Sequence, residues 1–209
     1  MTFEQVQNQV LKLLNQYSVA GTIVAPAYNN QQDYLNRMAS LANDAVMEIA
    51  TTARKIPAAL SLDALYGEDA GDYLRYELPE DFYQFKTGDT LLTTDEGRLL
   101  HTNCYTVSGR RYLLVPKREI EEGASYTITY YRYPKLLGEK PDATDELDNE
   151  PETHFAVPFY VAAFLVIHDD SFLFSAFYNK FEDKLAKMSA GLSVEARAVD
   201  DVYDFGAGE

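Results

Sequence analysis

The sequence predicts an α+β protein in which a helical bundle, formed by a pair of helices at each end of the chain, carries a small, mostly antiparallel β-sheet domain as an insertion. Three observations lead to this prediction. Apolar residues recur at helical spacing towards both ends of the chain. The middle changes to short β-branched and aromatic runs separated by turn residues. Two acidic stretches carry most of the net charge of −15 and are typical of connecting segments.

The N-terminal part, residues 1–56, is expected to be a helical hairpin. Its first helix is predicted over about residues 3–17, where Thr2 and Gln5 fit a capping box at the start. Its second helix is predicted over about residues 31–53, which present one apolar stripe at steps of three and four. An apolar stripe of this kind must be covered by another part of the protein.

The middle of the chain, residues 57–138, is expected to be the β insertion. Its strands are placed between about residues 72 and 133, where glycine-containing turn sequences recur at intervals suited to hairpins. The clearest strand covers residues 126–133, and Pro134 closes it because proline cannot continue a central ladder. The single cysteine, Cys104, lies in another predicted strand and is interpreted as a buried structural thiol rather than a nucleophile.

An acidic connector, residues 139–152, is followed by a C-terminal helical hairpin, residues 153–190. The connector holds seven acids against one lysine, so solvated chain kept extended by self-repulsion is expected. The apolar run over residues 155–167 is shorter than the roughly 20 residues that a bilayer requires, which predicts a buried helix. The last helix carries its apolar face on Phe174, Phe177, Phe181, Leu185 and Met188. The two helix pairs are predicted to bury their apolar faces against each other.

The final segment, residues 191–209, is expected to be an extended acidic tail. It contains an isolated apolar trio, Val202, Tyr203 and Phe205, in a sequence that is otherwise small and acidic. Such a trio is either incidental or an anchor that docks on a neighbouring molecule, because folding on binding requires a few large apolar side chains. We take the three residues as a candidate partner-binding anchor.

The sequence contains no motif of catalytic or cofactor chemistry. A nucleophile elbow, a phosphate-binding loop and a His-Glu-x-x-His motif are all absent, so no catalytic residue, cofactor or metal site is predicted and an enzyme is not expected. His168 precedes Asp169 and Asp170, but neighbouring residues on a helix point in different directions and cannot all face one ion. These acids are therefore interpreted as caps at a helix junction.

The charge and the cysteine content restrict the possible partners and compartments. Binding to the DNA backbone requires clustered Lys and Arg to displace counterions, which a chain of net charge −15 does not favour. One cysteine allows no internal disulfide, as expected in a reducing compartment, and the first residues lack the pattern of a secretion signal. The acidic stretches could alternatively form a surface that repels DNA or meets a basic partner.

The order of these features resembles the head–tail connector proteins of tailed double-stranded DNA phages, which are also called adaptor, tail-completion or tail gatekeeper proteins. The likeness is carried by packing and turn motifs within about residues 76–188. These motifs are Leu78-Pro79-Glu80-Asp81-Phe82, Tyr131-Arg132-Tyr133-Pro134-Lys135, Glu146-Leu147-Asp148, Val157-Pro158-Phe159-Tyr160-Val161-Ala162-Ala163, Asp169-Asp170 and Phe177-Tyr178-Asn179-Lys180-Phe181-Glu182. The β insertion is long for a simple adaptor, so a gatekeeper or tail-tube component stays open.

The resemblance implies a structural protein of the virion, located at the head–tail junction and assembled in the host cytoplasm. Its implied partners are further copies of itself in a ring, commonly of twelve subunits, the portal protein and a downstream tail component. Genomic DNA would pass through the lumen without specific binding, and a negative inner wall would favour this passage. No membrane partner is implied.

Two other functions remain open on the residues alone. The sixteen tyrosines, many of them in the β region, suit sheet packing and subunit contacts, but also a module that binds carbohydrate or another ligand by stacking. A metal-dependent hydrolase would have to use the acids near His168.

Overall fold

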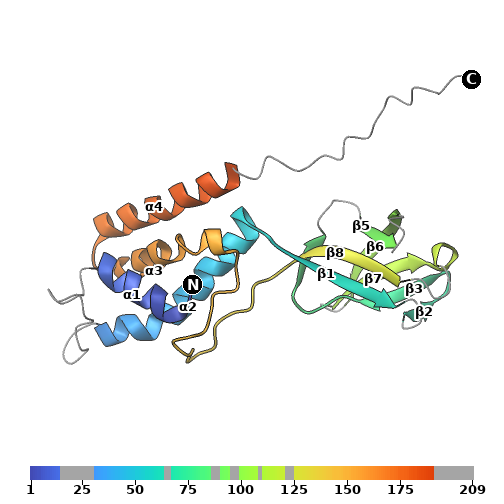
Figure 1. Cartoon of the computed structure of the whole chain (residues 1–209), viewed down its shortest axis with the longest axis horizontal. Helices are drawn as coiled ribbons and strands as arrows, with labels where there is room; N and C mark the ends of the chain where they lie inside the picture. Colours follow the sequence, from blue (N-terminus) through green and yellow to red (C-terminus); the bar gives the residue numbers. More distant parts are fainter. Residues whose placement is uncertain are drawn as a thin grey trace, which may run out of the picture.

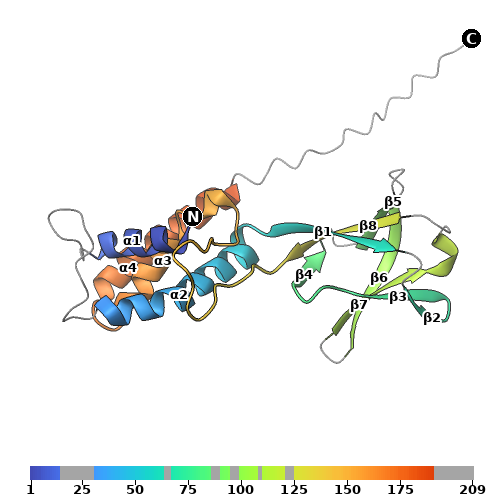
Figure 2. The same cartoon turned by 60° about the horizontal axis from the view of Figure 1, so that its bottom comes forward.

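In the computed structural model, the protein consists of a helical body and a body of β-strands at opposite ends of an elongated molecule (Figure 1). Figure 2 shows the same separation from a second direction. The structure describes residues 1–14, 31–63, 67–85, 90–94, 99–107, 110–120 and 125–190. The chain enters the strands after the second helix and returns before the third, and the predicted α+β class is confirmed.

The helical body contains α1 (Phe3–Leu13), α2 (Gln31–Glu48), α3 (Val157–Val166) and α4 (Ser171–Ala190). The predicted capping box is present, because the Thr2 side chain accepts from the Gln5 backbone while the Gln5 side chain accepts from the Thr2 backbone. α1 ends at Leu13, before the expected residue 17. A short π-helix, η1 (Ile49–Ala53), continues α2 to the predicted end at residue 53.

α3 lies at the centre of the helical body, where it packs against α1, α2 and α4. Its sequence is apolar on all sides, as expected of a helix that is enclosed by others. The most deeply buried side chains of this core are Val6, Val10, Leu11, Met38, Ile49, Leu165 and Phe181. On α4, Phe181 and Leu185 are buried as predicted, whereas Phe174, Phe177 and Met188 are half-buried, because α4 covers only one side of α3. Within the described residues, none of the helices combines the length and apolar character needed to cross a membrane.

The strands are β1 (Ile56–Asp63), β2 (Glu68–Ala70), β3 (Tyr73–Glu77), β4 (Phe82–Phe85), β5 (Thr90–Thr94), β6 (Leu99–Val107), β7 (Arg110–Pro116) and β8 (Ser125–Arg132). All pairings are antiparallel and follow the order β1-β8-β5-β6-β7-β3-β2, with β4 also paired to β8. The path divides into two small sheets within β6. This strand pairs with β5 from Leu99 to Thr102 and with β7 from Asn103 onwards. Cys104 lies in β6, in a strand as predicted.

The sheet begins earlier than the predicted residue 72, because β1 and β2 precede that position. β1 contains Pro57 and lacks the alternation and the β-branched residues that would mark a strand in the sequence, apart from Ile56. It is extended because it pairs with β8 along its whole length, from Ile56 opposite Arg132 to Asp63 opposite Ser125. The strand predicted at residues 126–133 is β8.

The acidic connector, residues 139–152, is attached to the helical body at its C-terminal end. Leu147 is buried in the helical core, and the Leu147 backbone nitrogen donates to the Met1 carbonyl (3.1 Å). The Phe3 backbone nitrogen donates to the Asp145 carbonyl (2.7 Å). The prediction of solvated chain is therefore wrong for Leu147, and it is also wrong for Asp148 and Glu150, which form ion pairs.

Candidate functional site

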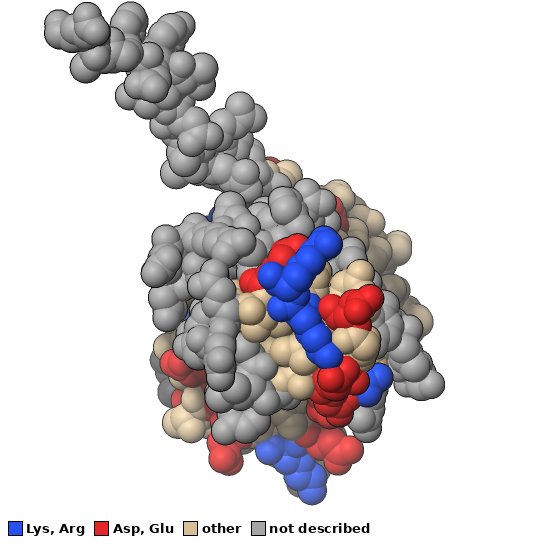
Figure 3. All heavy atoms as spheres, turned by 90° about the vertical axis from the view of Figure 1, so that its right-hand side faces the viewer, with Lys and Arg blue, Asp and Glu red and all other residues tan. Residues whose placement is uncertain are grey.

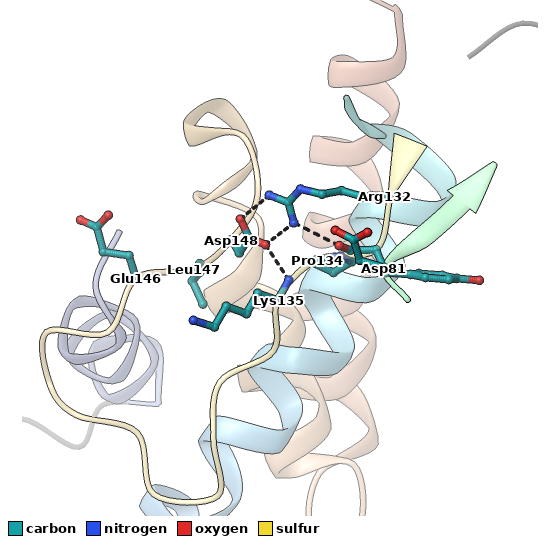
Figure 4. Close-up of a pocket in the computed structure, with 8 residues that line it drawn as sticks. Asp81, Arg132, Pro134, Lys135, Glu146, Leu147 and Asp148 are labelled. Atoms are coloured by element: carbon teal, nitrogen blue, oxygen red, sulfur yellow. Dashed lines mark hydrogen bonds and ion pairs between the residues drawn. The ribbon is translucent and has the colours of Figure 1, made fainter. Parts of the chain in front are cut away.

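A groove lies where the strands meet the helical body, and the residues around it join the two parts (Figure 4). Its volume is about 670 Å³. β8 supplies one side of this junction groove as the chain leaves the sheet, and the acidic connector supplies the other. The lining residues are Asp81, Arg132, Tyr133, Pro134, Lys135, Glu146, Leu147 and Asp148.

Asp148 and Arg132 form a two-pronged ion pair across the junction (Figure 4). Arg132 Nη1 donates to Asp148 Oδ2 (2.6 Å), and Arg132 Nη2 donates to Asp148 Oδ1 (2.8 Å). The backbone nitrogen of Lys135 also donates to Asp148 Oδ2 (2.5 Å). Because Arg132 ends β8 and Asp148 precedes α3, this arrangement fixes the return of the chain from the strands to the helices.

A second set of contacts connects the outgoing chain with the returning chain. Arg54, between η1 and β1, forms an ion pair with Glu150 of the connector. The Lys55 ammonium lies over the ring of Tyr131 at 5.4 Å from its centre, in the geometry of a cation–π contact. The two segments of chain that connect the bodies are thus bound to each other as well as to the helices.

Hydrogen bonds and burial determine the charge states of the groove. The Arg132 guanidinium holds the pKa of Asp148 below its usual value, and the Asp148 carboxylate raises the pKa of Arg132 in return. Burial raises the pKa of Tyr130, and the nearby Asp81 carboxylate, which accepts from the Tyr130 hydroxyl at 3.3 Å, raises it further. These shifts keep Asp148 and Arg132 charged and Tyr130 neutral. The arrangement is suited to holding two bodies in a fixed relation rather than to transferring a proton.

His154 is buried and hydrogen-bonded, whereas His168 is exposed. His154 is buried, its Nε2 donates to the Asn149 carbonyl (3.0 Å), and its Nδ1 accepts from the Met1 amino group (2.8 Å). His168 is exposed at the junction of α3 and α4. In the described part of the chain, no group of three or more His, Cys, Asp and Glu side chains is placed to hold a metal ion.

Asp170 caps α4, as the sequence predicts. Its Oδ1 accepts from the backbone nitrogens of Phe172 and Leu173, both at 2.9 Å. Its carbonyl accepts from the backbone nitrogen of Phe174 (3.0 Å). The acid pair after His168 therefore starts a helix.

Tyrosines of the β region contribute to the core between the two sheets. Tyr76, Tyr126 and Tyr130 are at most 8% exposed and belong to one cluster of buried side chains. Sheet packing is thus confirmed for these three residues. At the strand end of the molecule, basic and acidic side chains lie side by side (Figure 3). Such a surface has no single sign of charge.

The structure describes the residues of the junction groove but not those of the predicted anchor. Val202, Tyr203 and Phe205 lie outside the described residues. Arg132 and Asp148 belong to two motifs that carry the family resemblance, but their pairing was not predicted. The only signal in the sequence is that Leu147 is an isolated apolar residue among acids, which indicates a docked segment.

A protein-family model described as SU10 adaptor protein matches residues 1–202. No curated protein matches the chain. The family match covers the helical body, the strands and the connector, and it confirms the resemblance to phage head–tail adaptor proteins, which are structural proteins that assemble with other head and tail components. The chain belongs to the SU10 adaptor protein family.

Proposed function

We propose that this protein is a head–tail connector that forms a ring, joins the portal to the tail and leaves an axial passage for DNA. The observation that carries the proposal is the family match over residues 1–202. A connector requires two contact regions held in a constant relation. The helical body and the strand body, joined by the Arg132–Asp148 and Arg54–Glu150 ion pairs, meet this requirement.

The helical body supplies the ring wall in this proposal. Residues 1–56 and 153–190 form it as a bundle. Residues 57–138 are inserted between these two parts, and residues 139–152 connect the insertion to the second part. Phe172 and Leu173 begin α4 at the end of the helical body remote from the strands (Figure 1). The Phe172 side chain is 78% exposed, and Phe155 before α3 is 59% exposed. Large exposed apolar side chains of this kind are typical of contacts with other subunits.

The strand body reaches the portal or the next tail component, and the ring contains twelve copies. The C-terminal segment, residues 191–209, supports assembly through Val202, Tyr203 and Phe205. DNA passes through the lumen without specific binding, which the net charge of −15 supports because a negative wall disfavours close contact with phosphates. Assembly takes place in the host cytoplasm, and the finished protein is part of the virion.

Coexpression with the portal protein of the same phage tests the proposal. A tagged portal should retain this protein through purification, and sedimentation should give one complex far heavier than the 23.6 kDa chain. A portal that retains none of this protein, in cells that contain both in folded form, contradicts the proposal.

Truncation after Ala190 tests the contribution of the C-terminal segment. The truncated chain should keep the circular dichroism spectrum and the unfolding transition of a folded protein while less of it is retained by the portal. Replacement of Glu195 and Glu209 by Gln, which removes charge and leaves the apolar trio and the acids next to it in place, is the control and should preserve assembly. Equal assembly of the truncated and intact chains would show that the segment is no anchor.

A further inference from the structure

We propose that the outer edge of β1 binds the C-terminal segment, residues 191–209, of an adjacent copy of this chain as an added β-strand. This inference rests on the proposed ring and identifies the contact through which one subunit is tied to the next. It is carried by a strand edge that no other described strand covers, by the groove beside that edge and by the place where α4 ends.

β1 is the first strand of the hydrogen-bonded path and pairs with β8 on one side. On its other side, no second strand of the described residues is bonded to it. The strand is eight residues long, and Ile56–Leu62 contains no charged residue. An edge of this length presents unpaired backbone donors and acceptors to another chain, and natural edges are usually shortened or charged to prevent such pairing.

The opposite end of the path is protected by its shortness and its charges, whereas Ile56–Leu62 of β1 has Pro57 and no charge. β2 is only three residues long and begins with Glu68 and Asp69. Glu68 is paired with Arg75, and Asp69 is paired with Lys117 at 2.6 Å. The contrast between the two edges indicates that β1 is kept open for a partner.

A groove of about 380 Å³ runs beside the second half of β1. Leu60, Ser61 and Leu62 line it from β1, Glu68 lines it from β2, and Arg75, Tyr76 and Glu77 line it from β3. A strand added to β1 would thus bond to the backbone of β1 and place alternate side chains over a surface formed by apolar side chains and by the Glu68–Arg75 ion pair.

The end of α4 lies close to the start of β1. α4 packs against η1, and η1 leads through Arg54 and Lys55 directly into β1 (Figure 1). Eleven residues, 191–201, separate α4 from the apolar trio and span roughly 36 to 40 Å when extended. This length is sufficient to reach the corresponding edge of a neighbouring subunit. All copies in a cyclic ring are related by rotation about one axis, so the end of α4 in a neighbour lies at the same height along the axis as the end of α4 beside η1 and the start of β1. A segment that leaves the neighbour's α4 and extends along β1 would therefore run parallel to β1.

The sequence of the segment fits this site and this direction. Val202, Tyr203 and Phe205 are residue types that favour strands and can lie over the groove. Asp200 and Asp201 precede them, so a parallel segment brings these two acids to the start of β1. Lys55 is located there, with its ammonium group over the ring of Tyr131. An acidic segment is therefore attracted at the start of the strand. Ile56–Leu62 carries no charge, and of the two acids that line the groove beside its second half, Glu68 and Glu77, the first is paired with Arg75.

Disulfide trapping in full-length chains tests the proposed pairing. Cys104 is first replaced by Ser, and Ala59→Cys is placed in one chain while Tyr203→Cys, Asp204→Cys or Phe205→Cys is placed in another. Adjacent strands lie about 4.8 Å apart, and a disulfide requires Cα atoms roughly 4.4 to 6.8 Å apart, so only residues side by side are joined. The two chains are mixed and assembled with the portal. Ala186→Cys, at an exposed position of α4, replaces Ala59→Cys as the matched control.

The expected result is a disulfide-linked pair of chains for at least one of the three positions, with a yield at least tenfold above the Ala186→Cys control. Complexes that form without such a link overturn the inference and leave the proposed function standing. A link from Ala59→Cys to the portal overturns the choice of partner. A chain carrying both substitutions that links only within itself overturns the exchange between neighbours. If none of the chains assembles with the portal, the proposed function fails and the inference fails with it.

Discussion

Asp148 accepts hydrogen bonds from two nitrogens of Arg132 and from the backbone of Lys135. The substitution Asp148→Asn removes the negative charge and leaves a half-buried guanidinium without its partner. We expect the free energy of unfolding to fall by about 1 to 3 kcal/mol, as measured by urea denaturation. Glu139→Gln, in the exposed part of the same connector, is the control and should change stability by less than about 0.5 kcal/mol. Equal effects of the two substitutions would mean that the ion pair contributes nothing specific.

His154 makes stability depend on pH in a window that few other groups share. Burial lowers its pKa below the ordinary value of 6.5. As the pH falls through that value, the unfolded chain takes up a proton that the folded protein excludes, so stability is full above pH 6.5 and declines below it.

Unfolding by urea at pH 7.5 and at pH 5.5 measures this decline. His154→Gln should make the difference between the two conditions smaller, whereas His168→Gln, at an exposed position, should leave it unchanged. An undiminished difference in His154→Gln would assign the pH dependence to other groups.

At this scale, the sequence predicts local pairs better than distant ones. Thr2 with Gln5 and Asp170 with the start of α4 are recognisable because partners three or four residues apart follow from helix geometry alone. Arg132 and Asp148 are sixteen residues apart, and their meeting depends on how the connector folds back. The acids of the connector suggested repulsion from one another, whereas Asp148 and Glu150 find arginines from other segments.

At the scale of elements, α4 depends on its N-terminal cap. Asp170→Ala removes the acceptor for two backbone nitrogens, and we expect it to lower the free energy of unfolding by about 1 kcal/mol. Asp169→Ala alters the neighbouring exposed acid and should cost less than half as much. Thermal unfolding followed by circular dichroism provides the comparison. If Asp169→Ala is the more harmful change, Asp170 is not the cap.

α1, α2 and α4 were predictable as elements because their apolar residues follow one period over several turns, and α3 was predictable because its apolar run is continuous. β8 was predictable because it is rich in β-branched and aromatic residues. β1 was not, since Pro57 and the run Ala58-Ala59-Leu60 carry no strand pattern and its conformation is imposed by β8. The same features leave its outer edge uncharged over Ile56–Leu62, and this is the edge for which we propose an added strand.

At the scale of the whole molecule, the α+β class and the resemblance to connector proteins could be predicted, but the spatial arrangement could not. The sequence indicates which faces are apolar and does not say that α3 lies between the other helices. It also does not reveal that the two bodies lie at opposite ends of the molecule, with a charged joint between them (Figure 1). This arrangement follows from contacts between segments that are far apart in the chain, such as Arg54 with Glu150.

Electron cryo-microscopy of virions, or of capsids assembled with the tail, tests the central claim most directly. The account predicts a closed ring of this protein directly beneath the portal, with neighbouring helical bodies in contact, the two bodies of each subunit arranged as in Figure 1 and a central channel wide enough for duplex DNA. A map that places the protein elsewhere in the particle, or as isolated copies without contact to one another, would contradict it.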